Sequence, residues 1–402
     1  MATNKMAHEE LKYGEFLARM YRSDCKEVID AEHQRIISEK VEGTFTAEKE
    51  NRSLNQFAHT VCFDHSRVIL PKERNGGNYI NANYIDGFEH TKKFICGEAP
   101  TRSTCYDFYR MLWMEQVQII VMLTQKKENG KEKCYPYWSD VEKTSFRFGK
   151  FQITTTNVEK FPHYVKSILV LTDGTKATQT VTHFNFTAWP DHDVPKNPSE
   201  FVSFVLEVRQ RQRELHENSL QNGHKRSQPP PIVVHCNAGL GRTPCYCVVD
   251  ISISRFHQTQ TISIPSIVSD IRQKRYHSLF NPFQYFFCYE AVKLYLESAV
   301  TKASEFNCED LLKFVKQSVF EEIVAEEHKA IFCKPAGGTF RECQKVENTH
   351  LNRIKHPNCF DHSRVILPTE KKRGDYINAN YVDGYNHARK FICMQAPMNI
   401  AV

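Results

Sequence analysis

A long internal repeat limits what this chain can fold into. Residues 63–100 match residues 360–397 at 26 of 38 positions. Within that match, Phe63–Pro71 recurs letter for letter as Phe360–Pro368. Chance does not produce such a match, so we interpret the chain as two copies of one domain.

The second copy is shorter than the first. A weaker upstream match places its start near residue 304, and the sequence stops at Val402, after the counterpart of the first third of copy one. We therefore expect one domain over 10–300 and a truncated copy over 304–402. A docking or regulatory appendage is one interpretation of the short copy, and the remnant of a tandem gene is the one we favour. We expect it to pack loosely unless it leans on the first domain.

Composition supports a globular protein and excludes several partners. Of the 402 residues, 41% are hydrophobic and 25% charged, which is enough for a core and unlike a disordered or fibrous chain. The net charge of +6 is spread over both copies. A basic face for nucleic acid is therefore not expected.

The cysteines indicate a reducing compartment. The first ten residues contain no apolar signal core, and the apolar run Val117–Leu123 is far below the roughly 18 residues that span a bilayer. We therefore expect a cytoplasmic protein without a membrane partner, whose 14 cysteines are mostly free thiols. No Cys-x-x-Cys pair occurs, so neither a metal nor another cofactor is expected.

Hydrophobic spacing predicts an α/β domain in which helices flank a highly twisted mixed β-sheet. A polar loop is expected over 216–231, and Ser199 is the expected cap of the helix before it. Helices are expected over 12–39, 106–116, 199–215, 243–257, 265–276 and 282–300. Strands are expected over 117–124, 150–156, 164–172, 179–187 and 232–235.

The segment Ile232–Thr243 carries the chemistry: a buried strand runs through a glycine-containing loop into a helix. We expect the loop amides and the positive helix end to bind a tetrahedral dianion, with Arg242 offering two donors to its oxygens. Cys236 lies in the same positive field, so it is expected largely as a thiolate aimed at phosphorus. The expected binding residues are Asn237, Ala238, Gly239, Leu240 and Gly241.

A buried structural cysteine is the alternative interpretation of Cys236. A Cys and an Arg six positions apart would favour that alternative if they stood alone. Gly239 and Gly241, together with the strand-to-helix setting, favour the nucleophile instead.

At this point the sequence resembles a family. His-Cys-Asn-Ala-Gly-Leu-Gly-Arg-Thr closely resembles the signature of the classical protein tyrosine phosphatases, and further motifs follow in that family's order over residues 10–300. The truncated tandem layout also resembles compact phosphatases of insect-associated viruses. The supporting motifs are Phe63–Arg67, Tyr79–Asn83, Lys133-Cys134 with Tyr137-Trp138, Trp189–Asp191 and Gln284-Tyr285.

The resemblance implies roles for residues outside the loop. Asp191 would be the general acid for the tyrosine oxygen, on a mobile loop. His235 would support the thiolate through a hydrogen bond, and Thr243 would hydrogen-bond the sulfur as a leaving group. In isolation each of these has an ordinary structural explanation, such as a turn, a core histidine or a helix cap.

The resemblance also implies a surrounding set of contacts. Lys133 and Glu128 would steady the acid loop and Arg242, and Phe57 would stack on the phosphotyrosine ring. Gln284 belongs to the expected substrate-binding set. The second copy has no counterpart of Asp191, Cys236 or Arg242, so catalysis is expected from the first copy alone.

Departures from the family pattern limit the expected activity. The glutamine that positions water falls on Phe280, which cannot hydrogen-bond, and the aspartate that holds the peptide falls on His59. Asp193 stands where glycine is usual, and Pro244 replaces a glycine at a helical turn that tolerates proline.

Two functions follow as hypotheses from these features. The first is hydrolysis of phosphotyrosine on proteins through a phosphocysteine. The alternative is a substrate trap in which Phe280 stalls breakdown of that intermediate. A third, scaffolding interpretation would require no phosphate binding.

Overall fold

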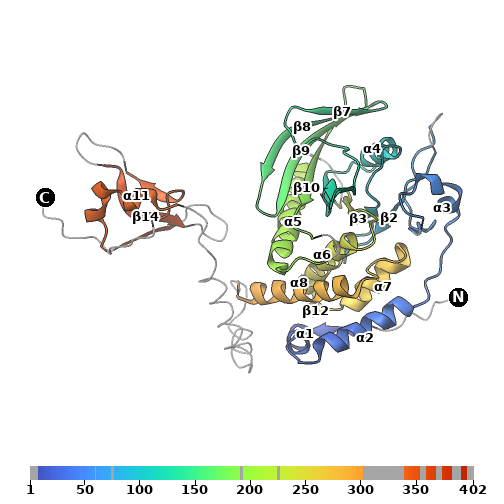
Figure 1. Ribbon diagram of the computed structural model, residues 1–402, viewed down its shortest axis with the longest axis horizontal. Helices are drawn as coiled ribbons and strands as arrows, with labels where there is room; N and C mark the ends of the chain where they lie inside the picture. Colours follow the sequence, from blue (N-terminus) through green and yellow to red (C-terminus); the bar gives the residue numbers. More distant parts are fainter. Residues whose placement is uncertain are drawn as a thin grey trace. The chain divides into compact units, whose positions relative to one another are not determined.

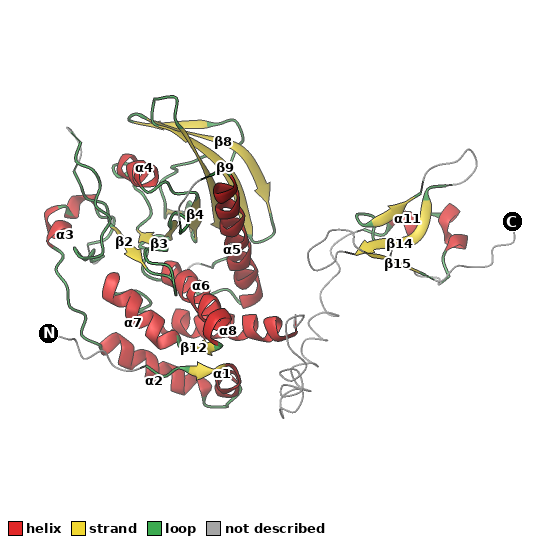
Figure 2. Ribbon diagram, turned by 180° about the vertical axis from the view of Figure 1, so that it is seen from behind, coloured by secondary structure: helices red, strands yellow, loops and turns green. Residues whose placement is uncertain are grey.

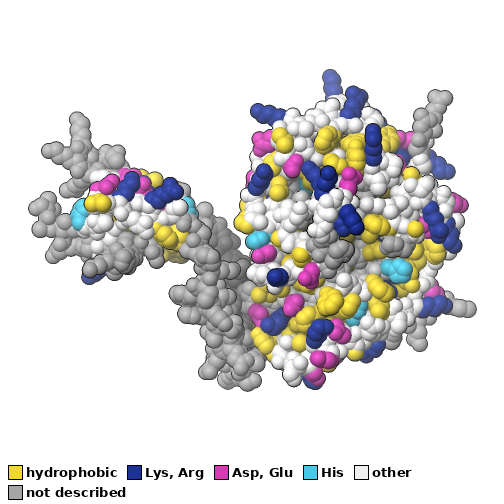
Figure 3. Space-filling view, in the orientation of Figure 1, with side chains coloured by type: hydrophobic (Ala, Val, Ile, Leu, Met, Phe, Trp, Pro, Cys, Tyr) yellow, Lys and Arg dark blue, Asp and Glu magenta, His cyan; other side chains and the backbone are white. Residues whose placement is uncertain are grey.

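The structure is a computed structural model, and the chain divides into two compact units, Met1–Ser304 and Glu305–Val402. It describes residues 8–58, 60–73, 77–190, 193–223, 227–301, 339–353, 359–367, 374–382 and 391–395. No helix in these ranges is both long enough and apolar enough to cross a membrane. In Figure 3, side chains of both charge signs are dispersed over the visible face of the first unit.

In the described residues of the first unit, eight strands form one mixed sheet (Figure 1). Its four central strands, β3, β11, β4 and β10, are parallel, and antiparallel strands flank them on both sides. The strands in spatial order are β2 (Ala82–Ile85), β3 (Phe94–Gly97), β11 (Ile232–His235), β4 (Ile119–Met122), β10 (Thr178–Phe186), β9 (Tyr164–Thr172), β8 (Phe151–Lys160) and β7 (Ser145–Phe148). The predicted mixed sheet is confirmed.

Helices cover both faces of this sheet (Figure 2). Helix α4 (Cys105–Met114) packs on the face that carries Ile120, Val181 and Val233. On the opposite face, Phe184 and Phe186 contact Phe204 of α5. The other long helices are α1 (Tyr13–Met20), α2 (Cys25–Ser38), α5 (Pro198–Gln221), α6 (Arg242–Thr259), α7 (Ile264–Lys274) and α8 (Pro282–Thr301).

Short elements complete the first unit. Strand β1 pairs with β12, and β5 pairs with β6 in a small hairpin that carries Glu128. Their bounds are β1 (Leu11–Lys12), β12 (Thr261–Ile262), β5 (Lys127–Glu128), β6 (Lys131–Glu132), α3 (Thr46–Glu50) and the 3-10 helix η1 (Arg52–Leu54).

Two expected helices differ from the structure by more than two residues. The helix expected over 12–39 is broken at residues 21–24, where Arg22 donates two hydrogen bonds of 2.7 Å to the Asp24 carboxylate. The prediction was also wrong over 216–221, because α5 continues to Gln221. No glycine or proline interrupts it there.

The cap of α5 also differs from the prediction. Asn197, rather than Ser199, caps the helix, and its side chain accepts a 3.0 Å hydrogen bond from the Ser199 amide. Pro198 occupies the first helical turn, where a missing amide costs nothing.

The second unit has a small core. Its elements are α11 (Arg341–Gln344), η2 (Val346–Leu351), β13 (Arg364–Ile366), β14 (Tyr376–Val382) and β15 (Phe391–Met394). The core cluster in the described part consists of Cys343, Cys359 and Tyr376, with Phe340 and Leu351 packed against it. Strand β15 pairs with β14, and its side chains are exposed.

Candidate active site

The candidate site is the turn between β11 and α6. Cys236 follows directly on β11, at the centre of the sheet, and its side chain is buried. The amide of Gly239 donates a 3.2 Å hydrogen bond to Cys236 Sγ. The loop therefore curls back over the sulfur before α6 begins at Arg242.

Both loop glycines lie close to neighbouring segments. Gly239 has a φ of +69°, and a Cβ there would overlap the carbonyl oxygen of Gly97 on β3. A Cβ on Gly241 would press against the side-chain amide of Gln284, at the start of α8. At Gly239 the loop therefore fits against β3 only without a side chain, whereas a side chain at Gly241 would require the flexible Gln284 side chain to move.

The carbonyl groups of this loop are bound from outside. The oxygens of Asn237 and Leu240 accept 2.8 Å hydrogen bonds from the amides of Ala99 and Leu279. Since the C=O and the next N–H of a trans peptide point in opposite directions, the amides of residues 238 and 241 point toward the inside of the loop. This is the arrangement that an anion site requires.

Arg275 completes this outer support, and the sequence did not indicate it. Its buried guanidinium donates to the Gly239 oxygen (2.9 Å) and to the Ala238 oxygen (3.1 Å). The remaining Nη1 donates to Asn83 Oδ1 on β2 over 2.8 Å. Arg275 is distant in sequence from both Asn83 and Gly239, so no local pattern could have revealed these contacts.

Arg242 is held by Glu128. Nη1 and Nη2 of Arg242 lie 2.6 Å and 3.0 Å from the two Glu128 carboxylate oxygens. Burial raises the pKa of Glu128, but the hydrogen bonds and charge of Arg242 outweigh burial, so that pKa lies below its usual value. Lys133 Nζ lies 4.0 Å from Glu128 Oε2. The structure thus brings all three charged residues together.

His235 and Thr243, the residues expected to support the sulfur, lie at the end of β11 and at the start of α6. His235 Nδ1 lies 3.2 Å from the backbone oxygen of Cys236, and its Nε2 lies 2.8 Å from the Tyr137 hydroxyl. Burial lowers the pKa of His235 to about 4, so the ring is neutral at pH 7. Thr243 Oγ1 is buried with no hydrogen-bond partner among the described residues.

Phe57 lies in a segment that is fixed next to the loop. The neighbouring Gln56 amide donates a 2.8 Å hydrogen bond to Glu98 Oε2. Glu98 directly precedes Ala99, whose amide binds the loop at Asn237. Phe57 itself is half-buried.

Asp191, its neighbour His192 and the substrate-loop residue His59 lie outside the described residues. The residues that flank the loop of the expected acid are described. The Pro190 oxygen accepts a 3.1 Å hydrogen bond from Arg242 Nη2, and Trp189 Nε1 donates to the Asp193 oxygen over 2.8 Å. The two ends of this loop therefore meet beside Arg242.

Phe280 lies directly after Leu279, whose amide binds the loop. Its side chain is 60% exposed and edge-on to His277, with 6.2 Å between ring centroids. The position that the resemblance assigns to a water-holding glutamine thus carries an exposed hydrocarbon ring.

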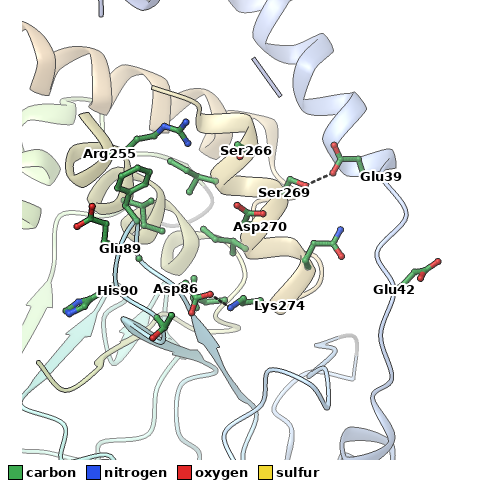
Figure 4. Close-up of a pocket in the computed structure, with 18 of the residues that line it drawn as sticks. Glu39, Glu42, Asp86, Glu89, His90, Arg255, Ser266, Ser269, Asp270 and Lys274 are labelled. Atoms are coloured by element: carbon green, nitrogen blue, oxygen red, sulfur yellow. Dashed lines mark hydrogen bonds and ion pairs between the residues drawn. The ribbon is translucent and has the colours of Figure 1, made fainter. Parts of the chain in front are cut away.

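A separate cavity of about 950 Å³ lies between α7 and the loop that follows β2 (Figure 4). Two of its carboxylates have partners: Asp86 pairs with Lys274, and Glu39 accepts a 2.7 Å hydrogen bond from Ser269. Its lining includes no residue of the loop around Cys236. We therefore place the candidate site at Cys236 and not in this cavity.

Comparison with known proteins agrees with this geometry. The family model for protein-tyrosine phosphatase matches residues 51–293 and 348–402, more than half of the chain. The chain belongs to the protein-tyrosine phosphatase family. The second match lies within the second unit, so part of that unit also resembles the phosphatase domain.

Two viral proteins and a human one illustrate the relationship. Tyrosine phosphatase H2 of Microplitis demolitor bracovirus is 48% identical over 298 residues, covering 73% of this chain and 91% of that protein. Tyrosine phosphatase-like protein J1 of the same virus is 34% identical over 284 residues, covering 69% and 93%. Human receptor-type tyrosine-protein phosphatase epsilon is 33% identical over 392 residues, covering 93% and 53%. The resemblance to viral phosphatases is confirmed.

Proposed function

We propose that this phosphatase hydrolyses phosphotyrosine on proteins through a phosphocysteine intermediate. The Cys236 thiolate attacks phosphorus, and the S–P bond forms as the bond to the tyrosine oxygen breaks. Asp191 donates a proton to that oxygen. Water then gives a proton to the Asp191 carboxylate and attacks phosphorus, the S–P bond breaks, and phosphate and the thiolate are released.

The observation that carries this proposal is the outward binding of the loop carbonyls. With the carbonyls of Asn237 and Leu240 bound from outside, their peptide amides are oriented inward before any ligand arrives. Preorganised donors of this kind stabilise negative charge on a transferring phosphoryl group without a reorganisation cost. Arg242, fixed by Glu128, adds a positive charge at the rim.

Turnover of a small aryl phosphate tests the proposal. We expect Cys236→Ser to abolish turnover and Asp191→Ala to reduce it by about 10²–10⁴-fold, the usual contribution of a general acid. Cys25→Ser is the matched control, because Cys25 lies at the start of α2, outside the site. Equal rates for Cys236→Ser and the parent would refute the nucleophile.

Phe280 favours a second candidate, a substrate trap. Its exposed ring has no group that could orient water toward a phosphocysteine. The trap predicts a burst of one phenol per enzyme followed by a slow steady state, and Phe280→Gln would accelerate the slow phase. One linear rate shared by parent and variant would exclude the trap.

We also propose that residues 10–300 form the catalytic domain and that 304–402 form a noncatalytic copy. The support is that the Cys236 loop and its described contacts lie within the first unit. A thiolate nucleophile is preserved in a reducing compartment, which supports a cytoplasmic location.

A further inference from the structure

Three buried side chains form a continuous hydrogen-bonded chain behind Cys236. The Tyr137 hydroxyl lies 2.7 Å from His183 Nε2 on β10 and 2.8 Å from His235 Nε2 on β11. All three side chains are fully buried. The proposed reaction gives no role to His183 or to the Tyr137 hydroxyl.

The direction of the hydrogen bonds in this chain follows from its Cys236 end. The Cys236 backbone oxygen can only accept, so His235 Nδ1, 3.2 Å away, carries the proton. Burial keeps that ring neutral, so its Nε2 has a lone pair and accepts from the Tyr137 hydroxyl. The Tyr137 oxygen then accepts from His183 Nε2–H.

The far end of the chain agrees with this direction. His183 Nδ1 is then a bare lone pair, and it is a buried atom without a hydrogen-bond partner among the described residues. Burial, His235 and Lys126 together hold the pKa of His183 well below its usual value, so this ring is neutral as well.

The opposite direction of these hydrogen bonds would be less favourable at both ends of the hydrogen-bonded chain. It would leave an N–H of His183 buried without an acceptor. It would also place the lone pair of His235 Nδ1 against the lone pairs of the Cys236 oxygen. The observed spacing therefore favours one orientation of all three groups.

We propose that His183 is a positioning residue: by donating to Tyr137 it directs the Tyr137 hydroxyl to His235 and fixes the His235 tautomer that holds the Cys236 backbone. The effect on turnover rests on the proposed function, whereas the tautomers do not. Because β10 leads into Trp189 and Pro190, His183 also connects the strand before the acid loop with the strand before the nucleophile.

Nitrogen NMR of the full chain labelled with ¹⁵N-histidine tests the tautomers directly. We expect the Nδ1–H form at His235 and the Nε2–H form at His183, both unchanged between about pH 6 and 8. The His183→Gln variant assigns its own signals by their loss. An Nε2–H form at His235 would overturn the proposal whatever the activity of the protein.

Turnover of an aryl phosphate tests the consequence. Losing one neutral hydrogen bond predicts that His183→Leu lowers kcat about tenfold, with KM changed less than about twofold. His183→Gln keeps an N–H donor and should restore kcat to within about threefold of the parent. Equal losses in the Leu and Gln variants would mean that His183 only fills space, and would overturn the proposal.

A double-mutant cycle shows whether His183 acts through Tyr137. Adding His183→Leu to Tyr137→Phe should lower kcat no further than Tyr137→Phe alone. Additive losses would contradict that route. If the variants fail to fold, the tautomers of the parent still decide the proposal. A parent that lacks Cys236-dependent turnover but shows the expected tautomers would refute only the proposed function.

Discussion

Arg275 donates its Nε–H to the Gly239 carbonyl oxygen over 2.9 Å, fixing the centre of the loop from behind. Arg275→Lys keeps the charge but loses the planar set of donors, leaving buried acceptors unpaired. We expect it to lower the free energy of unfolding by about 2–4 kcal/mol, measured by urea denaturation. Arg102→Lys, at an exposed position, is the control. Equal losses in both variants would contradict the role of Arg275.

Alanine variants of Gly239 and Gly223 distinguish the cost of steric overlap from the cost of backbone strain. Both glycines have a left-handed φ, but a Cβ on Gly239 overlaps the Gly97 oxygen, whereas a Cβ on Gly223 meets nothing within 4 Å. We expect Gly223→Ala to cost about 1 kcal/mol and leave turnover intact. Gly239→Ala should cost several times more and abolish aryl phosphate turnover. Full activity in Gly239→Ala would show that the loop can adopt another course.

The Glu128–Arg242 pair predicts a pH dependence of stability. The folded-state pKa of Glu128 lies below its usual value, so its contribution is present above the unfolded-state pKa, about 4.3, and is lost as pH falls through the folded-state pKa. The parent should therefore be more stable than Glu128→Gln at neutral pH. This difference should shrink on acidification in urea melts at a series of pH values. A difference that grows toward low pH would contradict the pairing.

A second buried carboxylate supports the sheet from the α6 side. Asp250 pairs with Lys93 of the loop before β3 and, over 2.9 Å, with Arg209 of α5. Burial raises the pKa of Asp250, but the two cations lower it further, to below its usual value. Asp250→Asn leaves buried cations unpaired, so we expect a loss of about 3–5 kcal/mol at pH 7.

The double variant Asp250→Asn with Lys93→Met provides the control for that loss. It removes a buried positive charge together with the negative one, so we expect it to recover part of the stability lost in Asp250→Asn. A double variant that is less stable than Asp250→Asn, by urea denaturation, would contradict this electrostatic explanation.

Deleting residues 304–402 tests whether the first copy alone carries out catalysis. The described site contacts lie in the first unit, so the shortened chain should keep kcat/KM for a small aryl phosphate within about twofold. A loss of more than about tenfold would show that the second copy contributes to catalysis.

The local parts of the fold could be read from the sequence. The strand before Cys236 and the glycine-dependent turn were correct, because alternation, glycine and buried apolar runs act over a few residues. The break at residues 21–24 was missed because no glycine or proline marks it, and the end of α5 at Gln221 was missed because the polar residues 216–221 were assigned to the loop. The cap of α5 is Asn197 rather than Ser199, because the Asn197 side chain accepts a hydrogen bond from the Ser199 amide.

The supporting contacts of the site could not be predicted. Arg275 binds the Cys236 loop directly, whereas His183 is connected to it through Tyr137 and His235, and both come from segments far away in the sequence. Family motifs indicated Glu128 and Lys133, but residue spacing carries no information on the carboxylate geometry that holds Arg242. The proton positions in the hydrogen-bonded series His183–Tyr137–His235 follow from distances between atoms that only the folded structure provides.

The strand sequence Phe-Ile-Cys occurs twice in this chain with opposite solvent contact. In β3, Ile95 and Cys96 are 0% and 2% exposed, whereas in β15 Ile392 is 54% exposed and Cys393 is exposed. Burial of this segment is thus decided by neighbouring strands and not by its own letters. A thiol-alkylating dye would label Cys393 in the native protein and reach Cys96 only when the first unit unfolds. The labelling rate of Cys96, compared with that of Cys393, would therefore report unfolding of the first unit.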